Sequence, residues 1–295
     1  MKRVTLLTIA TALLLACIFL SGCEPTQEAS AEEFYRDKVA VLMYHHIDWE
    51  FDSRVTITPD RFEEHLDTLL NKGYNVITLS HFRSFLRGEM EVPPNAVLIT
   101  FDDGYESFYN YAYPLLKERG MSATMFMVVG QIGDKEGGLP KLDWSQMRTM
   151  IGSSMYFQSH SYNSHFYNYI DAEGNWEKPA LVARAYLIEE GRIETEEEYR
   201  SRIYEDLRRS KEILEQGLGV YVDVFSVPYG WKNEEVVEVA RGVGFEYIFT
   251  IQPGLVSMTS DLMSLSRINA GSPDIDGNRV HQLILEALGK EGGNK

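Results

Sequence analysis

The sequence predicts a parallel α/β domain whose sheet is either barrel-like or open. Two observations point to this class. Short apolar segments alternate with helical patterns along the chain, and several of these segments are apolar on both faces, as in strands of a sheet covered by helices. The 295 residues are enough for one large domain or two small ones. In such sheets, active sites lie at the carboxyl ends of the strands.

Seven apolar segments are the expected strands. In chain order they are VAVLMY (39–44), AVLITF (96–101), ATMFMVV (123–129), MYFQSH (155–160), DVFSVP (223–228), FEYIFTI (245–251) and LMSLSRI (262–268). The sequence also predicts loops at 132–143 and 167–180. The second of these loops is an expected wall of a substrate groove.

Helical patterns lie between the strands, at 59–73, 109–120 and 195–217. The first begins at Pro59 and ends at Gly73, the usual order of these two residues around a helix. The second contains Pro114, which can kink it. The third begins with Thr195 and Glu198 at capping-box spacing, and its many charges are expected to face solvent.

The N-terminal residues have the pattern of a lipoprotein signal. Lys2 and Arg3 form a positive start, and residues 4–20 carry no charge. The stretch LSGC that follows, residues 20–23, resembles a bacterial lipobox, in which the cysteine is lipidated. We therefore expect a signal peptide over 1–22, a membrane anchor at lipidated Cys23 outside the cytoplasm, and a polar tether over 23–37. An uncleaved membrane anchor is the alternative.

Charge and cysteine content exclude several classes of function. The formal net charge is −16, which argues against nucleic acid as a partner because its phosphates would be repelled. The only cysteines are Cys17 and Cys23, and both lie within the expected signal and anchor. A mature domain without cysteine has no disulfide, no thiol nucleophile and no cysteine–zinc site.

Three expected strand ends carry groups that bind metals. TFDDG contains Asp102 and Asp103, whose adjacent charges repel each other unless a cation compensates them. SHSYNSH contains His160 and His165, and YHH contains His45 and His46. Asp103, His160 and His165 would leave coordination positions open for water and substrate, as catalytic metal sites do. Asp102 would then be free to take a proton from the water.

The same stretches resemble the polysaccharide deacetylases, the NodB-homology or carbohydrate esterase family 4 group. VLITFDDGYESFYNYAYPLLKERGMSATMFMV resembles the first family motif, SHSYNSH the second and FSVPYG the third. With VLMYHHI and LMSLSRI, the resemblance covers a domain at 38–290, which leaves a tail at 291–295. It implies a distorted (β/α) barrel, a divalent metal that is usually zinc, and removal of N-acetyl groups from a GlcNAc-containing polymer.

The family's roles can be carried over residue by residue. The resemblance makes Asp102 the general base and Asp103, His160 and His165 the metal ligands. It also assigns the backbone N–H of Tyr229 to the oxyanion. His46, His65, His81 and His281 are better interpreted as surface or packing residues.

The departures from the family pattern favour one branch. The step of five residues from His160 to His165 resembles the enzymes that deacetylate poly-β-1,6-N-acetylglucosamine. In that branch the general acid is a histidine of an early YH motif, which favours His45 over His46. Ser226 stands where many members have an arginine that orients the base. Arg267 is a candidate to replace that arginine.

Other functions remain open on these residues. A peptidoglycan or chitin deacetylase, or an O-acetyl esterase of the xylan type, would use the same chemistry. A non-catalytic glycan-binding lipoprotein would keep the fold but lose some of the metal ligands. A solute-binding lipoprotein would account for the anchor but not for the metal-binding residue types. The sequence leaves the polymer, the preferred metal and any protein partner undetermined.

Overall fold

The computed structural model describes residues 32–50 and 53–289. All described helices and strands belong to the second of two units, Glu33–Lys295; the first unit is Met1–Glu32. The expected signal peptide, Cys23 and the tail at 291–295 lie outside the described residues. In the described part of the chain, no helix has both the length and the hydropathy that a membrane span needs.

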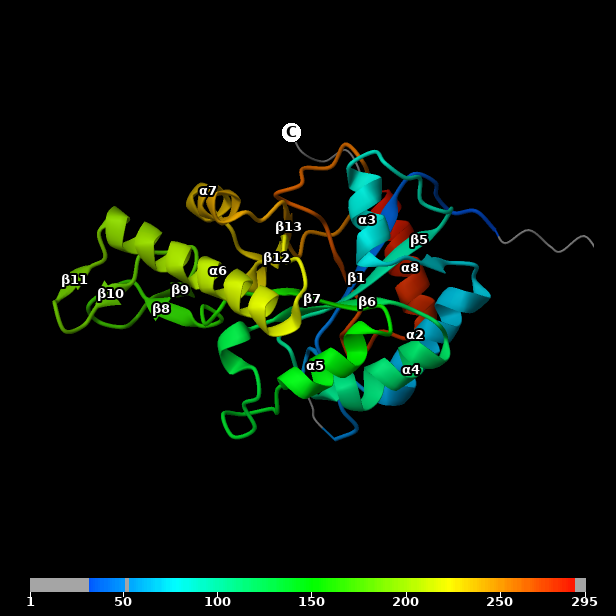
Figure 1. The fold of residues 1–295 in the computed structure, drawn as a ribbon, viewed down its shortest axis with the longest axis horizontal. Helices are drawn as coiled ribbons and strands as arrows, with labels where there is room; N and C mark the ends of the chain where they lie inside the picture. Colours follow the sequence, from blue (N-terminus) through cyan, green and yellow to red (C-terminus); the bar gives the residue numbers. More distant parts are fainter. Residues whose placement is uncertain (1–31, 51–52, 290–295) are drawn as a thin grey trace, which may run out of the picture. The chain divides into compact units, whose positions relative to one another are not determined.

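A mainly parallel sheet forms the centre of the second unit (Figure 1). The strand order is β13–β12–β7–β6–β5–β1–β14, with β15 also on β1 and β4 also on β5. Only the pair of β1 and β14 in this described sheet is antiparallel. The sheet curls into a half-barrel surrounded by helices, so the expected parallel α/β class is confirmed.

The strands of this sheet have the following bounds: β1 Val39–Tyr44, β4 Asn75–Val76, β5 Ala96–Phe101, β6 Ala123–Met127, β7 Met155–Ser159, β12 Val224–Ser226, β13 Tyr247–Phe249, β14 Leu255–Val256 and β15 Ile268–Asn269. Smaller pairs are β2 His46–Ile47 with β3 Thr56–Ile57, β8 Tyr167–Tyr169 with β9 Glu177–Pro179, and β10 Tyr186–Leu187 with β11 Arg192–Ile193. The helices are α2 Pro59–Asn71, α3 Leu79–Leu86, α4 Tyr113–Glu118, α5 Trp144–Ile151, α6 Glu196–Leu218, α7 Glu234–Val243 and α8 Gly277–Leu288.

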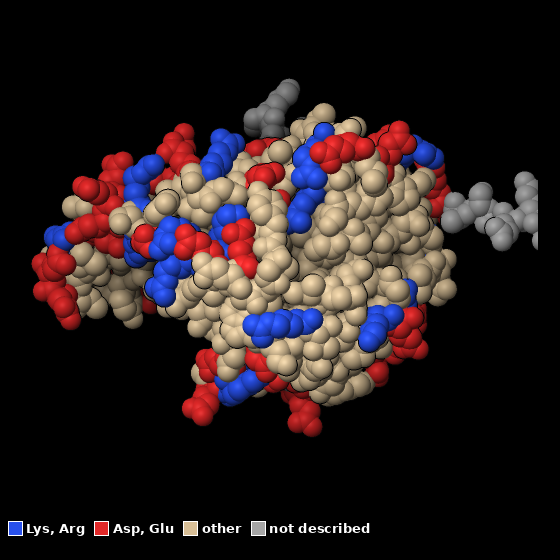
Figure 2. Space-filling view, viewed as in Figure 1, with Lys and Arg blue, Asp and Glu red and all other residues tan. Residues whose placement is uncertain are grey.

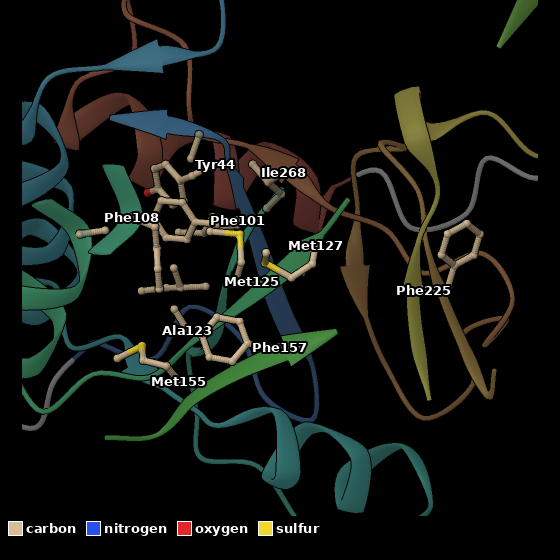
Figure 3. Packing of buried hydrophobic residues seen from close by; sticks show 14 of the residues in the cluster. Tyr44, Phe101, Phe108, Ala123, Met125, Met127, Met155, Phe157, Phe225 and Ile268 are labelled. Atoms are coloured by element: carbon tan, nitrogen blue, oxygen red, sulfur yellow. The ribbon is translucent and has the colours of Figure 1, made fainter. Parts of the chain in front are cut away.

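Both faces of the sheet are packed. Every residue of β1 and of β5 is buried. On β1, Leu42 and Tyr44 belong to one apolar cluster and Val41 to a second, because successive side chains of a strand point to opposite faces. Figure 3 shows Phe101 and Met125 of the first cluster pointing into the same space. This two-sided burial explains why these strands have no alternation of polar and apolar residues.

The expected helices form, with one local difference. α2 begins at Pro59 as predicted, and α6 begins after Thr195, which forms a complete capping box with Glu198. The segment 109–120 is divided into a π-helical turn, Phe108–Ala112, and α4. Pro114 comes just after this turn, and the backbone before it is already helical at Ala112, so the helix continues past the proline. The N–H of Tyr113 bonds Phe108 O, five residues back, so the hydrogen bonding changes locally just before the proline.

The segment 262–268 differs from the predicted strand. It is mostly irregular, and only Ile268 belongs to a strand. Leu265 makes an isolated parallel bridge with Phe249 of β13, whereas Ile268 pairs with Leu42 of β1. The segment therefore runs from one edge strand to a strand on the other side of the half-barrel.

Two further expectations on local structure are wrong in part. The predicted loop 167–180 contains the β8–β9 hairpin, because three-residue strands with exposed side chains leave little periodic signal. The expected tether extends too far, because Tyr35 is buried and its hydroxyl donates a hydrogen bond to Ala96 O at 2.8 Å. The folded part thus begins before residue 38.

Charged side chains gather over α6, α7 and the β10–β11 hairpin (Figure 2). Many of them pair with one another. Arg200 bonds Glu235 and Glu238, and Arg208 bonds Glu205 and Glu212. These pairs are exposed, so each contributes little to stability, and the charges of α6 form the solvated face expected from the sequence.

Candidate metal and catalytic site

The carboxyl ends of neighbouring strands bring the predicted residues together. His45 follows β1, Asp102 and Asp103 follow β5, and His160 follows β7. β1 and β5 are parallel, with Tyr44 opposite Phe101, so the residues after each strand end lie at one edge. His45 and Asp102 are 57 positions apart in the sequence, and so are Asp103 and His160. The parallel sheet makes them neighbours.

Asp103, His160 and His165 form a compact group with the geometry of a metal site. Asp103 Oδ1 lies 3.4 Å from His160 Nε2 and 3.2 Å from His165 Nε2. One ligand atom from each residue lies within 4.8 Å of the others. Asp103 Oδ1 is buried and accepts no hydrogen bond, which is costly unless a cation or a proton compensates it. The donor set therefore fits a divalent metal.

Neighbouring groups prepare the imidazoles for this role. His160 Nδ1 lies 2.7 Å from Ser226 O, and a carbonyl oxygen can only accept a hydrogen bond. The proton is therefore on Nδ1, and the lone pair of Nε2 faces Asp103. Burial lowers the pKa of His165 to about 4, so this side chain is neutral, the form that binds metals, at pH 7.

The pKa of Asp103 is also displaced. Burial would raise it, but a hydrogen bond from His160 and the positive charges that His45, His165 and His160 carry when protonated outweigh burial and hold the pKa well below its ordinary value. A divalent cation in the place of these protons would keep the carboxylate ionised in the same way.

The turn after β5 has an unusual backbone. Asp103 has φ = 72° and Gly104 has φ = 69°, both in the left-handed region. A Cβ on Gly104 would lie 2.6 Å from Met127 Cε, so only glycine fits there without rearrangement. Lys141 Nζ donates a hydrogen bond to Asp103 O at 3.0 Å and lies 3.8 Å from the centre of the Tyr105 ring. These contacts stabilise the conformation that points the Asp103 carboxylate at the histidines.

Asp102 is held by a buried arginine. Arg267 Nη1 lies 2.7 Å from Asp102 Oδ1, and Arg267 Nη2 lies 2.8 Å from Oδ2. Arg267 also donates from Nε to Thr250 O at 2.9 Å, and 1 % of the residue is exposed. Burial would raise the pKa of Asp102, but the guanidinium of Arg267 outweighs it and keeps the pKa below its usual value. The candidate base is thus a fixed, ionised carboxylate.

The structure separates the two adjacent histidines. His45 Nε2 lies 4.0 Å from Asp102 Oδ2, and its buried Nδ1 has no hydrogen-bond partner among the described residues. The His46 ring lies instead beside Tyr105, and its Nδ1 is 3.3 Å from Thr56 Oγ1. Only His45 faces the aspartate pair, as the alternation of the strand predicts.

The comparisons with known proteins can be set beside this geometry. The family model described as polysaccharide deacetylase matches residues 89–248, more than half of the chain. The chain belongs to the polysaccharide deacetylase family. Both the resemblance and the barrel fold expected from the sequence are confirmed.

Named relatives are similar to most of this chain. Poly-β-1,6-N-acetyl-D-glucosamine N-deacetylase of Escherichia coli K12 is 30 % identical over 287 residues, which cover 90 % of this chain and 42 % of the relative. The chain therefore spans less than half of that protein. IcaB from Ammonifex degensii is 27 % identical, with a TM-score of 0.69 over 84 % of this chain and 97 % of its own. A de-N-acetylase from Aggregatibacter actinomycetemcomitans has 24 % identity and a TM-score of 0.74 over 84 % and 100 %.

The remaining predicted residues are Tyr229, His65 and His281. Tyr229 has φ = 59°, and its ring centre is 4.5 Å from that of His165. Its ring is thus at the site, while the oxyanion role of its N–H stays a prediction. His65 is buried against Tyr44 and Ile275, and His281 contacts Tyr74, which agrees with packing roles.

Sequence reasoning missed two residues that support the site. One is Lys141, in a segment expected to be only a loop. The other is Asp206 of α6, whose carboxylate accepts hydrogen bonds from Tyr162 N at 2.9 Å and Asn163 N at 2.8 Å, in the turn between the two histidines. Its place beside the buried Leu207 was the available signal, because a charged residue at the edge of a buried face often has a partner.

Proposed function

We propose that this protein is a metal-dependent N-deacetylase that releases acetate from poly-β-1,6-N-acetylglucosamine. The observation that carries the proposal is the Asp103, His160 and His165 group beside a carboxylate, Asp102, that does not belong to it. The family supplies the reaction class. The substrate is inferred from the names of relatives at 23–30 % identity and from the step between the two histidines.

Each residue has a proposed role. A divalent cation held by Asp103, His160 and His165 would act as a Lewis acid toward the acetamide carbonyl and would acidify a water molecule. Asp102 accepts the proton of the attacking water, and Arg267 holds its carboxylate in place. The N–H of Tyr229 donates a hydrogen bond to the substrate oxygen as its charge develops. Protonated His45 gives its proton to the leaving amine.

We infer that the cation is zinc. One carboxylate and two imidazoles are a donor set that zinc enzymes use, and they leave positions for water and substrate. The purified protein should contain zinc, and a chelator should abolish acetate release. Addition of zinc, but not of magnesium, should restore it. Full activity after complete removal of metal would contradict the proposal.

The substrate is tested on a panel of defined glycans. Acetate release is measured from oligomers of poly-β-1,6-GlcNAc, chitin and peptidoglycan and from acetylated xylan, all with the same metal-loaded preparation. The proposal expects the highest kcat/KM on the β-1,6 oligomers. A preference for β-1,4-linked amino sugars, or for the xylan ester, would assign the protein to one of the other activities of its family.

We also propose that the protein is anchored outside the cytoplasm through lipidated Cys23, because LSGC follows an uncharged segment and a basic start. Cys23→Ser should move the protein from the membrane fraction to the soluble fraction and end incorporation of labelled palmitate. Unchanged membrane association in that variant would favour an uncleaved anchor. Any protein partner remains unknown.

A further inference from the structure

The β8–β9 hairpin carries tyrosines outward from the site. Tyr167 and Tyr169 are two residues apart on β8, so both point to the same face of the hairpin. Their exposed fractions are 46 % and 45 %, high for aromatic rings. Glu177 pairs with Tyr169 across the hairpin, which places its carboxylate on that face as well.

Tyr167 continues the ring contacts of the metal site. The ring centre of His165 is 4.5 Å from that of Tyr229, and the ring centre of Tyr229 is 4.6 Å from that of Tyr167. We call Tyr229, Tyr167 and Tyr169 the aromatic path. The path begins beside His165, a candidate metal ligand, and continues onto β8, where Tyr167 and Tyr169 are about half exposed.

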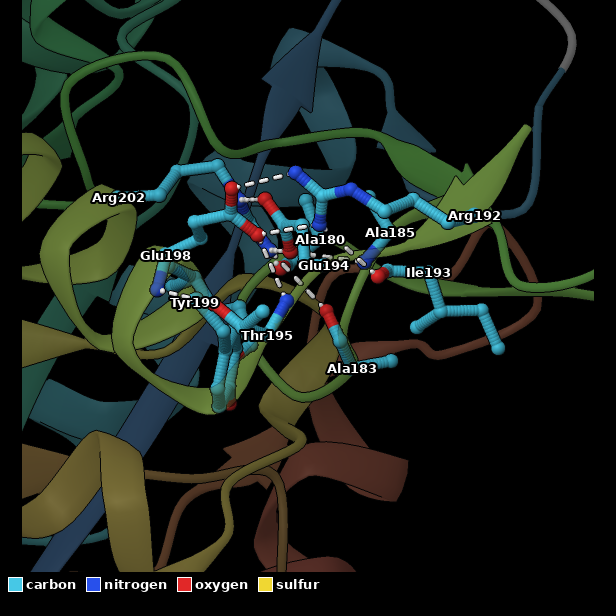
Figure 4. A network of polar contacts seen from close by, with 11 residues as sticks. Ala180, Ala183, Ala185, Arg192, Ile193, Glu194, Thr195, Glu198, Tyr199 and Arg202 are labelled. Atoms are coloured by element: carbon cyan, nitrogen blue, oxygen red, sulfur yellow. Dashed lines mark hydrogen bonds and ion pairs between the residues drawn. The ribbon is translucent and has the colours of Figure 1, made fainter. Parts of the chain in front are cut away.

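The hairpin is fastened to α6 at both ends. After β9, Arg202 donates hydrogen bonds to Ala180 O at 2.9 Å and to the carboxylate of Glu194 at 2.7 and 2.9 Å (Figure 4). Glu194 is buried, with 5 % exposed. Before β8, Asp206 holds the turn that carries His165. A surface fixed in this way loses little conformational entropy when a ligand binds.

We propose that Tyr167 and Tyr169 form a subsite for the sugar ring next to the residue that is deacetylated. The family acts on polymers, so the glycan must continue past the metal site. Sugar rings have apolar C–H faces that pack on aromatic rings, and hydroxyls that donate to carboxylates such as that of Glu177. The inference rests on the proposed function for its substrate, a β-linked N-acetylhexosamine chain.

The charge around the hairpin agrees with a neutral or cationic glycan. The segment 167–180 that holds the two tyrosines contains three acidic residues, Asp171, Glu173 and Glu177, and one basic residue, Lys178. These carboxylates would repel an anionic lipid surface. A GlcNAc unit is neutral and a deacetylated unit carries a positive charge, so both are compatible with this surface.

The test compares Tyr169→Ala with Tyr204→Ala. Tyr204 lies on α6 with 43 % exposed, close to the exposure of Tyr169, and away from the hairpin. On β-1,6 oligomers, Tyr169→Ala should lower kcat/KM by roughly three- to tenfold through KM, the range expected for loss of one ring contact. The loss should grow with oligomer length. On a small acetate ester both variants should match the wild type, and Tyr169→Phe should retain activity on all substrates.

The outcomes separate this inference from the proposed function. If the wild type prefers another glycan of the panel, the proposed substrate is wrong, and the same ratio is measured on the preferred glycan. If Tyr169→Ala equals Tyr204→Ala at every length, the subsite is wrong although the deacetylase assignment stands. If Tyr169→Ala binds anionic lipid vesicles less well than the wild type but has unchanged kinetics on the oligomers, the hairpin is a membrane contact and the subsite is wrong. If no glycan is turned over, both proposals fail.

Discussion

Arg267 and Asp102 are 165 residues apart in the chain, and their side chains meet in a two-point ion pair inside the protein, at 2.7 and 2.8 Å. Both are almost fully buried. A guanidinium fork holds a carboxylate in one orientation, whereas a lysine ammonium offers a point charge. The pair therefore accounts for the absence of an arginine at Ser226, whose hydroxyl lies 3.4 Å from the same carboxylate.

Removal of Arg267 should damage both stability and turnover. Arg267→Met leaves the Asp102 charge buried without a partner, which costs about 3–5 kcal/mol of unfolding free energy. Urea denaturation measures this loss. The double variant Arg267→Met with Asp102→Asn should recover part of it, because no buried charge remains. If the single and double variants unfold at the same urea concentration, the ion pair does not stabilise the fold as described.

The two adjacent aspartates should give different defects. Asp103→Asn should lose bound metal, because an amide is a much weaker ligand than the carboxylate aimed at His160 and His165. Asp102→Asn should keep the metal and lose roughly 10²–10⁴-fold in kcat, the usual contribution of a general base. Metal content and single-substrate kinetics on the same preparations make the comparison. Loss of metal from both variants would mean that Asp102 is also a ligand.

The two adjacent histidines provide a matched pair. His45→Asn should lower kcat for amide substrates by roughly 10²–10⁴-fold, since His45 is the imidazole that faces Asp102. His46→Asn should have a much smaller effect, because His46 contacts Tyr105 and Thr56. An activated phenyl acetate has a leaving group that needs no proton, so His45→Asn should hydrolyse it nearly as well as the wild type. Equal losses on both substrates would rule out a general acid role.

His65 should make the fold sensitive to acid. Burial lowers its pKa below 6.5, although the hydrogen bond to Ile275 O partly opposes this effect. Below about pH 6.5 the imidazole is therefore protonated in the unfolded chain but not in the folded chain. The free energy of unfolding then decreases with falling pH, by at most ~1.4 kcal/mol per pH unit. His65→Gln should reduce this slope in urea unfolding between pH 7.5 and 5, values chosen around the ordinary histidine pKa of about 6.5.

If the wild type and His65→Gln lose stability in parallel as the pH falls, then His65 is not the group that senses acid.

Arg202 should control the order of the hairpins. Arg202→Met removes the donors to Ala180 O and Glu194, and leaves a buried carboxylate unpaired (Figure 4). We expect faster limited proteolysis within 166–195 while cleavage elsewhere is unchanged. Arg208 lies on the same helix, and its ion pairs are exposed. The Arg208→Met variant should therefore be cleaved by the protease at the same rate as the wild type. Equal cleavage in both variants would show that the network does not fasten the hairpins.

The central strands could be predicted because burial on both faces leaves continuous apolar segments. β1 and β5 have the predicted bounds, 39–44 and 96–101. The segment 262–268 could not be predicted correctly, since its apolar residues pack against two different strands and never form one ladder. The β8–β9 hairpin was missed for the opposite reason, because its strands are exposed and three residues long.

The same contrast holds at the site. The metal group was predictable because Asp103 and His160 directly follow strands, and a parallel sheet gathers such residues. The partner of Asp102 could be named only as a candidate, because no local pattern relates Arg267 to a carboxylate 165 positions earlier. Asp206 was missed because α6 has many charged residues, and the sequence does not distinguish the one whose carboxylate accepts a hydrogen bond from Tyr162 N.

The segment that carries Arg267 comes late in the chain, and it also spans the opening between β13 and β1. A polypeptide still emerging from the ribosome can already contain Asp103, His160 and His165, but it lacks Arg267, so the Asp102 carboxylate has no guanidinium to hold it. The fixed orientation of Asp102 therefore depends on completion of the last edge of the half-barrel.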